Sequence, residues 1–313
     1  MKILITGGLG TIGRLLNYFL LKKNHDVFYL DLSHNNDKNY YRCDISKYSQ
    51  ISEILNKNEF DIVYHTGAEF GRWNGEDFYE NVWMSNAIGT KNIIRLQEIH
   101  KFKLIFFSSS EVYGDYEGIM SEDVLEKYPI KQMNDYAISK WSNEMQIKNS
   151  IIQFNTETVI LRLFNTYGPG EVYNNYRSVV ARFVNNCIKN EDLIVYKGHK
   201  RTSTYIMDLI NVCLKIPDNF KSGQTYNIAG DDVHTTEELA NIVIKNCGDT
   251  KSKIIIKDSE IMTTRDKVTT NFKIKKDFNF KQSVNIDQGV LNTYSWMKSY
   301  YDDNLKLTEL PFL

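Results

Sequence analysis

The sequence contains little cysteine, little proline and no long hydrophobic run, and each shortage excludes a class of protein. Its four cysteines in 313 residues are scattered, with no C-x-x-C pair and no histidines at metal-ligand spacing, so we expect neither a disulfide framework nor a metal site. Reduced thiols predict a cytoplasmic location. No apolar segment approaches the length of a membrane span and no cleavage site follows the apolar N-terminal segment, so we expect no membrane attachment.

The charge balance excludes a class of partner. The 38 Lys and Arg residues face 39 Asp and Glu residues, which leaves a formal net charge of -1. Because a surface that binds polyanions carries an excess of basic residues, we expect no nucleic-acid partner. The chain is long enough for one large or two medium domains with a sizeable core.

Short apolar runs typical of buried strands alternate with helical patterns along much of the chain. Strands that alternate with helices form a parallel sheet that is covered on both faces. We therefore predict an α/β fold with a Rossmann-type, doubly wound parallel sheet. The predicted strands span residues 2–5, 26–30, 61–65, 103–108, 158–163 and 225–228.

The first predicted strand runs directly into a turn with three spaced glycines and then into a helical pattern. Gly7 permits the tight turn, Gly10 leaves room for a pyrophosphate, and Gly13 lets the helix lie against the strand. The second strand ends at Asp31, near the spacing at which a carboxylate binds the adenosine ribose of a dinucleotide. Because Asp31 would repel the 2′-phosphate of NADP, the pattern predicts NAD.

A glycine and proline cluster at 167–170 predicts a domain boundary. We expect an NAD-binding Rossmann domain over residues 1–167, to which roughly 204–230 return. A smaller C-terminal substrate lobe is expected over 168–203 and 231–313, with a last helix from about 286 to 300. The lobe should close over the carboxyl ends of the strands, where open α/β sheets bind ligands.

Tyr136 and Lys140 lie one helical turn apart, but this spacing alone predicts little. It also occurs at Tyr18 and Lys22, because a chain with 20 tyrosines produces such pairs by chance. Position distinguishes Tyr136, which follows the strand that ends in the serine-rich segment 108–111. That strand end lies where the nicotinamide ring of a bound dinucleotide would lie.

Further motifs accompany the glycine turn, the serine strand end and the Tyr136 helix. They are Cys43-Asp44-Ile45, Asn86-Ala87-Ile88-Gly89-Thr90 and the run from Leu161 to Gly170. Together these motifs resemble the extended short-chain dehydrogenase/reductase family, the NAD-dependent epimerases and dehydratases of nucleotide sugars, over nearly the whole chain. The resemblance implies a nucleotide-sugar substrate and a homodimer formed through the helices that contain residues 86–100 and Tyr136.

The resemblance also implies a role for individual residues. The expected catalytic residues are Tyr136, Lys140, Ser109 and Glu111, and no metal ligand is expected. The expected substrate-binding residues are Ser110, Asn165, Arg177, Arg201, Glu69 and Arg72. The expected cofactor-binding residues are Gly7, Gly10, Thr11, Ile12, Gly13, Asp31, Asp44, Ile45, Ala68, Ser108, Tyr136 and Lys140.

These residue types suit the oxidation of a sugar carbinol, in which a proton leaves oxygen while a hydride leaves carbon. A free phenol has a pKa of about 10 and is a poor base at neutral pH. We expect the positive charges of Lys140 and of the nicotinamide to lower the pKa of Tyr136 so that it acts as the base. Ser109 is expected to hold the same sugar hydroxyl.

Glu111 leaves several reactions open. A carboxylate at this strand end could take the acidified C5 proton of a 4-keto sugar, as in a 4,6-dehydratase, although decarboxylases carry a similar Ser-Glu. Residues 68–73, the serine strand and residues 201–206 look most similar to bacterial GDP-manno-heptose 4-dehydrogenases of surface-polysaccharide pathways. We therefore expect C4 oxidation of a GDP-linked heptose, with a 4,6-dehydratase and a 4-epimerase as alternatives. A binding protein without chemistry would lack the Tyr, Lys or Ser, and all are present.

Overall fold

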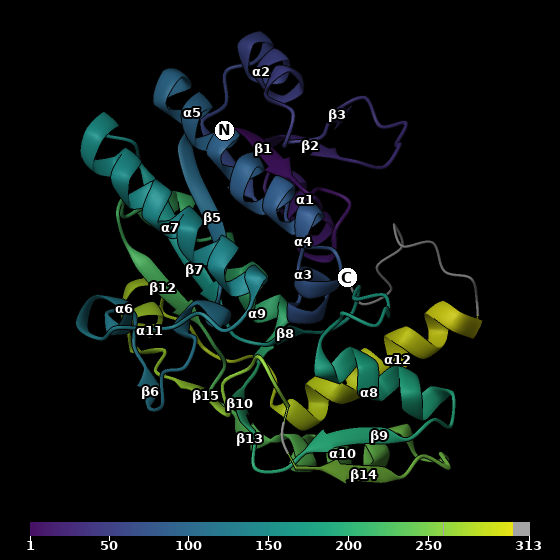
Figure 1. The fold of residues 1–313 in the computed structure, drawn as a ribbon. Helices are drawn as coiled ribbons and strands as arrows, with labels where there is room; N and C mark the ends of the chain where they lie inside the picture. The colour runs from purple at the N-terminus through teal and green to yellow at the C-terminus, as the bar shows by residue number, and fades with distance from the viewer. Residues whose placement is uncertain (259, 303–313) are drawn as a thin grey trace.

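A seven-stranded parallel sheet forms the centre of the upper part of the molecule in Figure 1. The computed structural model describes residues 1–258 and 260–302. Every pair of neighbouring strands in this sheet is parallel, which confirms the predicted doubly wound α/β fold. The strand order is β12 (Thr225–Ile228), β7 (Thr158–Leu163), β5 (Lys103–Ser109), β4 (Ile62–His65), β1 (Lys2–Thr6), β2 (Asp26–Asp31) and β3 (Tyr40–Arg42).

Helices cover both faces of this sheet. Alternate residues of a strand point to opposite faces, so Ile3 and Ile5 pack into one hydrophobic cluster and Leu4 into another. The first cluster includes side chains of α1 (Thr11–Lys22), α9 (Ile206–Cys213) and α11 (Phe272–Phe278). The helices on the other face are α2 (Tyr48–Lys57), α5 (Thr90–His100) and α7 (Asp135–Phe154).

Smaller sheets and three helices form the lower part of Figure 1. One sheet has the order β13 (Val233–Thr235), β10 (Lys200–Thr202), β15 (Asp266–Thr269) and β6 (Ile119–Met120). Two-stranded sheets pair β11 (Thr204–Tyr205) with β8 (Thr166–Tyr167), and β14 (Ile254–Lys257) with β9 (Leu193–Tyr196). The helices are α8 (Val179–Ile188), α10 (Thr236–Cys247) and α12 (Ile286–Asp302).

Short helices occupy several connections. They are α3 (Arg72–Asp77), α4 (Tyr79–Val82), the π-helix Trp83–Gly89 that joins α4 to α5, the 3-10 helix Ser110–Tyr113, α6 (Val124–Lys127) and the 3-10 helix Pro217–Asn219. The 3-10 helix Ser110–Tyr113 follows β5 directly, and α3 lies in the connection after β4. Both therefore start at the carboxyl edge of the large sheet, where the candidate site lies.

All six predicted strands are present, with ends that differ by one residue at most. The sequence analysis missed β3, a three-residue edge strand without an apolar run. Strand β12 joins the large sheet beside β7, in agreement with the predicted return of residues 204–230 to the first domain. Strand β6 lies within the predicted first domain in the sequence but pairs with β15 of the predicted lobe. The division into a cofactor domain and a substrate lobe stays a prediction. Residues 303–313 of the predicted lobe lie outside the described residues.

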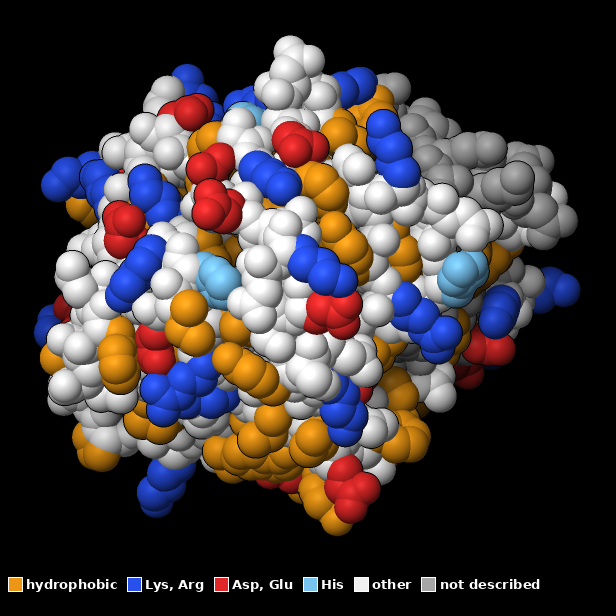
Figure 2. All heavy atoms as spheres, turned by 90° about the horizontal axis from the view of Figure 1, so that it is seen from above, with side chains coloured by type: hydrophobic (Ala, Val, Ile, Leu, Met, Phe, Trp, Pro, Cys, Tyr) orange, Lys and Arg blue, Asp and Glu red, His pale blue; other side chains and the backbone are white. Residues whose placement is uncertain are grey.

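The helices and one face of the surface can be compared with what a membrane or a polyanion would require. Within residues 1–258 and 260–302, no helix is both long enough and apolar enough to cross a bilayer. On the face shown in Figure 2, positive and negative side chains are interspersed, and hydrophobic side chains gather toward one edge of the view. This face therefore carries charges of both signs rather than one dominant basic patch.

A buried ion pair attaches α7 to the sheet. Arg162 on β7 donates to both carboxylate oxygens of Glu144 on α7, from Nε at 3.0 Å and from Nη2 at 2.7 Å. The two side chains are 1% and 0% exposed. Ser108 at the end of β5 donates to the same carboxylate at 2.6 Å, and Arg162 donates to Tyr113 Oη at 2.9 Å. These contacts fix the helix to two neighbouring strands.

We expect Arg162→Met to lower the free energy of unfolding by about 3–5 kcal/mol, because it leaves the buried Glu144 charge without its partner. Denaturant unfolding measures this loss. Lys148→Met is the control on the same helix, since Lys148 pairs with Glu126 near the surface and its loss should cost less than about 1 kcal/mol. Equal unfolding midpoints for the two variants would contradict the role given to the buried pair.

Candidate active site

The glycine turn after β1 forms a cradle at the start of α1. Gly7 has a φ of +69°, which favours glycine, and Gly10 precedes the first residue of the helix. A Cβ on Gly13 would clash with the carbonyl oxygen of Gly7, so only glycine allows this close approach. The first backbone amides of α1, which have no hydrogen-bond partner within the helix, thus face the space that a pyrophosphate requires.

A cavity of about 640 Å³ opens at this turn and continues along the carboxyl edge of the sheet. Its wall contains every residue that the sequence analysis assigned to the cofactor. It also contains Glu69, which was expected at the substrate, and Arg177. The assigned residues in the wall are Gly7, Gly10, Thr11, Ile12, Gly13, Asp31, Asp44, Ile45, Ala68, Ser108, Tyr136 and Lys140.

Two carboxylates in this wall are held by backbone amides. Asp31 accepts hydrogen bonds from Leu9 N at 3.0 Å and from Leu32 N at 2.7 Å, which ties the glycine turn to the end of β2. Asp44 accepts from Ser46 N at 2.9 Å. A glycine cradle, a helix N-terminus and an acid at the end of β2 are the parts that a dinucleotide requires, so these residues fit NAD.

Tyr136 and Lys140 project from the first turns of α7, whose N-terminus is capped by Asn134 Oδ1 at 2.8 Å from Ala137 N. Lys140 Nζ donates to the carbonyl oxygen of Phe107 at 2.8 Å and lies 6.0 Å from the centre of the Tyr136 ring. Tyr136 lines the cofactor cavity and a second, adjoining cavity. It therefore lies between the two cavities and can reach a ligand in either of them.

The acidity of Tyr136 differs from the sequence-based expectation. Burial has the largest influence and raises its pKa to about 12, although a hydrogen bond with Ser109 lowers it, and the charge of Glu111 raises it further. Burial also lowers the pKa of Lys140 to about 8. The expected lowering of the Tyr136 pKa by Lys140 is not seen in the chain alone, because burial outweighs a cation 6.0 Å from the ring centre.

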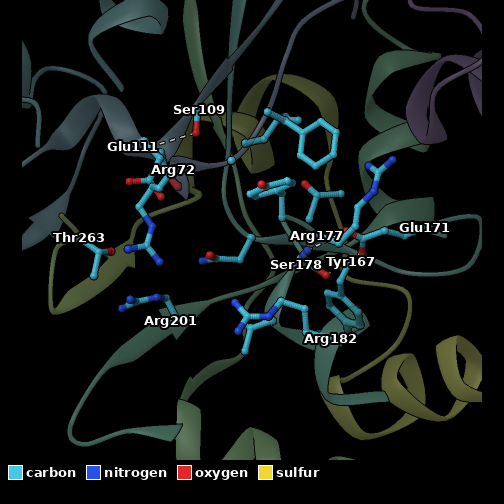
Figure 3. A pocket seen from close by; sticks show the side chains of 18 of the residues that line it. Arg72, Ser109, Glu111, Tyr167, Glu171, Arg177, Ser178, Arg182, Arg201 and Thr263 are labelled. Carbon is cyan, nitrogen blue, oxygen red and sulfur yellow. Dashed lines mark hydrogen bonds between the residues drawn. The ribbon is translucent and has the colours of Figure 1, made fainter. Parts of the chain in front are cut away.

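The second cavity, of about 350 Å³, is shown from close by in Figure 3. The guanidinium groups of Arg72, Arg201 and Arg182 lie around one space there, and Ser109 and Glu111 lie at its edge. A dashed line marks the 3.2 Å hydrogen bond from Glu111 N to Ser109 Oγ. The predicted catalytic and substrate-binding residues that line this cavity are Ser109, Ser110, Glu111, Tyr136, Asn165, Arg177, Arg201 and Arg72.

Three of the predicted site residues differ in which cavity they line or in what their side chains contact. Glu69 lines the cofactor cavity and not the second cavity, because it follows β4 closely and its Oε2 accepts a hydrogen bond from Asn74 Nδ2 at 3.0 Å. Arg177 lines both cavities, with its guanidinium carbon 4.1 Å from the centre of the Phe70 ring. Ser108 lines the cofactor cavity, but its hydroxyl is engaged with Glu144.

Hydrogen bonds to the protein fix two of the predicted substrate-binding side chains. Arg201 donates from Nη1 to the carbonyl oxygens of Lys200 and Arg265, at 2.8 and 2.6 Å. Asn165 donates to the carbonyl oxygen of Thr202 at 2.8 Å. Both side chains are thus oriented before any ligand binds, which lowers the entropic cost of binding.

Four charged residues that line this cavity were not predicted, namely Glu171, Arg182, Glu260 and Lys267. Glu260 pairs with Arg72 at 2.9 Å, and Lys267 pairs with Glu111. Lys267 lies on β15, far along the chain from Glu111, so no local pattern in the sequence joins them. The neighbouring Arg265 donates to Gly198 O at 3.4 Å.

The arrangement suits proton and hydride movement on a sugar carbinol. Bound NAD supplies the acceptor for the hydride. Tyr136 stands where it can take the hydroxyl proton, and Ser109 can hold the same oxygen. Arg201 and Asn165 also line this cavity, and a guanidinium and a side-chain amide are donors that suit phosphate oxygens.

Comparisons with known proteins agree with this arrangement. The chain is 30% identical to the UDP-N-acetyl-alpha-D-glucosaminuronate decarboxylase of Bacillus cytotoxicus over 253 residues, which are 76% of this chain and 78% of the relative. It is 27% identical to the ADP-L-glycero-D-manno-heptose-6-epimerase of Brachyspira hyodysenteriae over 258 residues, which are 76% of this chain and 79% of the relative.

The crystal structure of Pal from Bacillus thuringiensis is similar over 96% of this chain and 99% of that chain, with a TM-score of 0.87 and 26% identity. The model of the NAD dependent epimerase/dehydratase family matches residues 3–229. Its description names NAD, which confirms the predicted cofactor. Because the match covers more than half of the sequence, from the glycine turn to β12, the chain belongs to the NAD dependent epimerase/dehydratase family.

Proposed function

We propose that the protein oxidises the C4 hydroxyl of a nucleoside-diphosphate sugar with NAD, as a 4-dehydrogenase. The observation that carries this proposal is the position of Tyr136, which lines both the cofactor cavity and the adjoining cavity. A phenol there can reach a carbinol oxygen whose carbon faces the nicotinamide. Tyr136 is the base and Ser109 holds the hydroxyl, and Lys140 together with the positive ring of bound NAD would favour the phenolate that burial disfavours.

The proposed substrate is a nucleotide sugar, and a GDP-linked heptose is favoured. Arg201 and Asn165 are proposed to bind the diphosphate, and Arg72, Arg177 and Ser110 the sugar or a phosphate. Relatives whose names include UDP- and ADP-linked sugars support the nucleotide-sugar class. The resemblance of residues 68–73 and 201–206 to GDP-manno-heptose 4-dehydrogenases supports the heptose and a place in surface-polysaccharide synthesis.

Two other reactions remain alternatives, a 4,6-dehydratase and a 4-epimerase. Both start from the same oxidation and then return the hydride to the sugar. Glu111 favours the dehydratase, because a carboxylate beside C5 can take the proton that the 4-keto group acidifies. Relatives named as a dTDP-D-glucose 4,6-dehydratase and as a 4-epimerase support these alternatives.

We also propose a cytoplasmic homodimer. Four free, buried cysteines support a reducing compartment. Helices α4, α5 and α7 pack against the π-helix Trp83–Gly89, and this group exposes several large apolar side chains, which supports a shared interface between two copies. Those residues include Tyr79, Met84, Ile88, Ile138 and Met145.

We expect Tyr136→Phe to lower kcat by roughly 100- to 10,000-fold while NAD still binds, because it removes the proton acceptor and little else. Absorbance of NADH measures the oxidation and calorimetry measures NAD affinity. Tyr18→Phe is the matched control, since Tyr18 and Lys22 have the same spacing on α1, outside both cavities. Near-normal turnover of the Tyr136 variant would remove this residue from the mechanism.

Mass spectra of the products separate the candidate reactions. Incubation with NAD and several nucleotide sugars should give a product lighter by two hydrogens, as expected for a 4-dehydrogenase. Loss of water would identify a dehydratase, and an isomer of unchanged mass an epimerase. No change with any sugar would support a binding protein without chemistry.

We expect Asp31→Asn to weaken NAD binding by roughly tenfold, because the charge-assisted hydrogen bond to the adenosine ribose is lost. The preference for NAD over NADP should narrow, because the carboxylate no longer repels the 2′-phosphate of NADP. The asparagine keeps an oxygen for Leu9 N, so the glycine turn should hold its shape. Calorimetric titration with both cofactors gives the two affinities. An unchanged ratio of the two would show that Asp31 does not select the ribose.

We expect Met145→Glu to convert a dimer into a monomer of 36.6 kDa, because it places a charge in the proposed apolar interface. Light scattering after size exclusion measures the mass. Ile255→Glu is the control, since Ile255 is an exposed apolar residue on β14, away from these helices. A dimer that survives Met145→Glu and Ile88→Glu would place the interface elsewhere.

A further inference from the structure

An ion pair between Lys267 and Glu111 joins β15 to the 3-10 helix that follows β5. The side chain of Lys267 is 3% exposed and that of Glu111 is 17% exposed, and both line the second cavity. Lys267 contacts Glu111 Oε1. Among the described residues no hydrogen bond reaches Oε2, which leaves this oxygen for a ligand in the cavity.

Other charged groups around this pair already have partners. Arg72 on α3 pairs with Glu260 at 2.9 Å, and Arg201 on β10 donates to two backbone carbonyl oxygens and to His199 Nδ1. Tyr136 on α7 is the remaining titratable group that faces Glu111. Lys267 is therefore the one cation in direct contact with this carboxylate among the described residues.

A carboxylate at this depth needs that cation. Burial favours the neutral acid and would raise the pKa of Glu111, but Lys267 and then Arg72 outweigh burial, so its pKa lies below the usual value. Burial lowers the pKa of Lys267 to about 8, although Glu111 raises it. The pair is thus complete at neutral pH and is lost as the pH rises through about 8.

We propose that Lys267 is a positioning residue that keeps Glu111 ionised at the sugar end of the cavity, so that Glu111 Oε2 accepts a hydrogen bond from a substrate hydroxyl and does not donate one. The inference rests on the proposed function for the presence of a sugar at this end. The ion pair connects the segment directly after Ser109, at the end of β5, to β15. Sugar hydroxyls are donors, so an acceptor fixed there selects their orientation.

The first test follows the protonation of Glu111 directly. Carbon-13 NMR of protein labelled at the glutamate carboxyl, with Glu111→Gln to assign the signal, is recorded over pH in the presence of NAD and without sugar. In Lys267→Met we expect the midpoint of Glu111 to move up by at least about one pH unit, and in Lys267→Arg to stay near the wild-type value. Lys257→Met is the control at an exposed lysine on β14. An unchanged midpoint in Lys267→Met would overturn the proposal.

The second test uses turnover. We expect Lys267→Met to lower kcat about tenfold with KM for the nucleotide sugar changed less than about twofold, and Lys267→Arg to restore most of the rate. The double variant Glu111→Gln with Lys267→Met should be no slower than Glu111→Gln alone, since the residues act as a unit. A raised KM with kcat unchanged would instead make Lys267 a ligand of the diphosphate and contradict the inference.

A third arm covers the case in which Lys267→Met does not fold. Arginine stays charged at high pH, so Lys267→Arg should keep Glu111 paired above pH 8, where the wild-type pair is lost. In the carboxyl spectra, the Glu111 signal of the wild type should therefore shift as the pH rises through about 8, while that of Lys267→Arg stays constant there, and coincident signals would count against the pair. If no sugar is oxidised at all, the proposed function fails, while the NMR titration still decides the inference.

Discussion

The position of the proposed base depends on how α7 is held against the large sheet. Arg162 reaches from β7 to both oxygens of Glu144, one turn of α7 beyond Lys140, and Ser108 at the end of β5 joins the same carboxylate. Breaking this contact would free the helix from two strands at once. The position of Tyr136 relative to the carboxyl edge of the sheet therefore depends on an ion pair that is buried from solvent.

Burial and charge oppose each other throughout the site. Burial shifts the pKa of Tyr136 up and the pKa values of Lys140 and Lys267 down, in each case toward the neutral form. Specific partners counter this shift. Glu111 is the exception, since its cation lies in contact and its pKa falls. Whether a group is charged here is thus decided by single contacts between segments that are far apart in the sequence. The positive nicotinamide ring of NAD would add one more charge to this balance.

Local patterns were sufficient for most of the fold. The glycine turn, Asp31 and the apolar runs carry their information within a few residues, and each appears in the structure at the predicted place. Glu69, which was predicted to bind substrate, lines the cofactor cavity, because a loop position does not fix which way a side chain turns. Lys267 and Glu260 were missed because their partners, Glu111 and Arg72, come from distant elements. The pKa of Tyr136 could not be inferred because spacing along a helix says nothing of burial.

Strand β6 has a consequence for how the chain can be divided. It lies between β5 and α7 in the sequence, yet its only strand partner in the described residues is β15, near the other end. Strand β12 crosses in the opposite direction and forms the edge of the large sheet beside β7. Any cut between β6 and β15 breaks the four-stranded sheet, so dividing the chain at one position cannot isolate the two sheets intact.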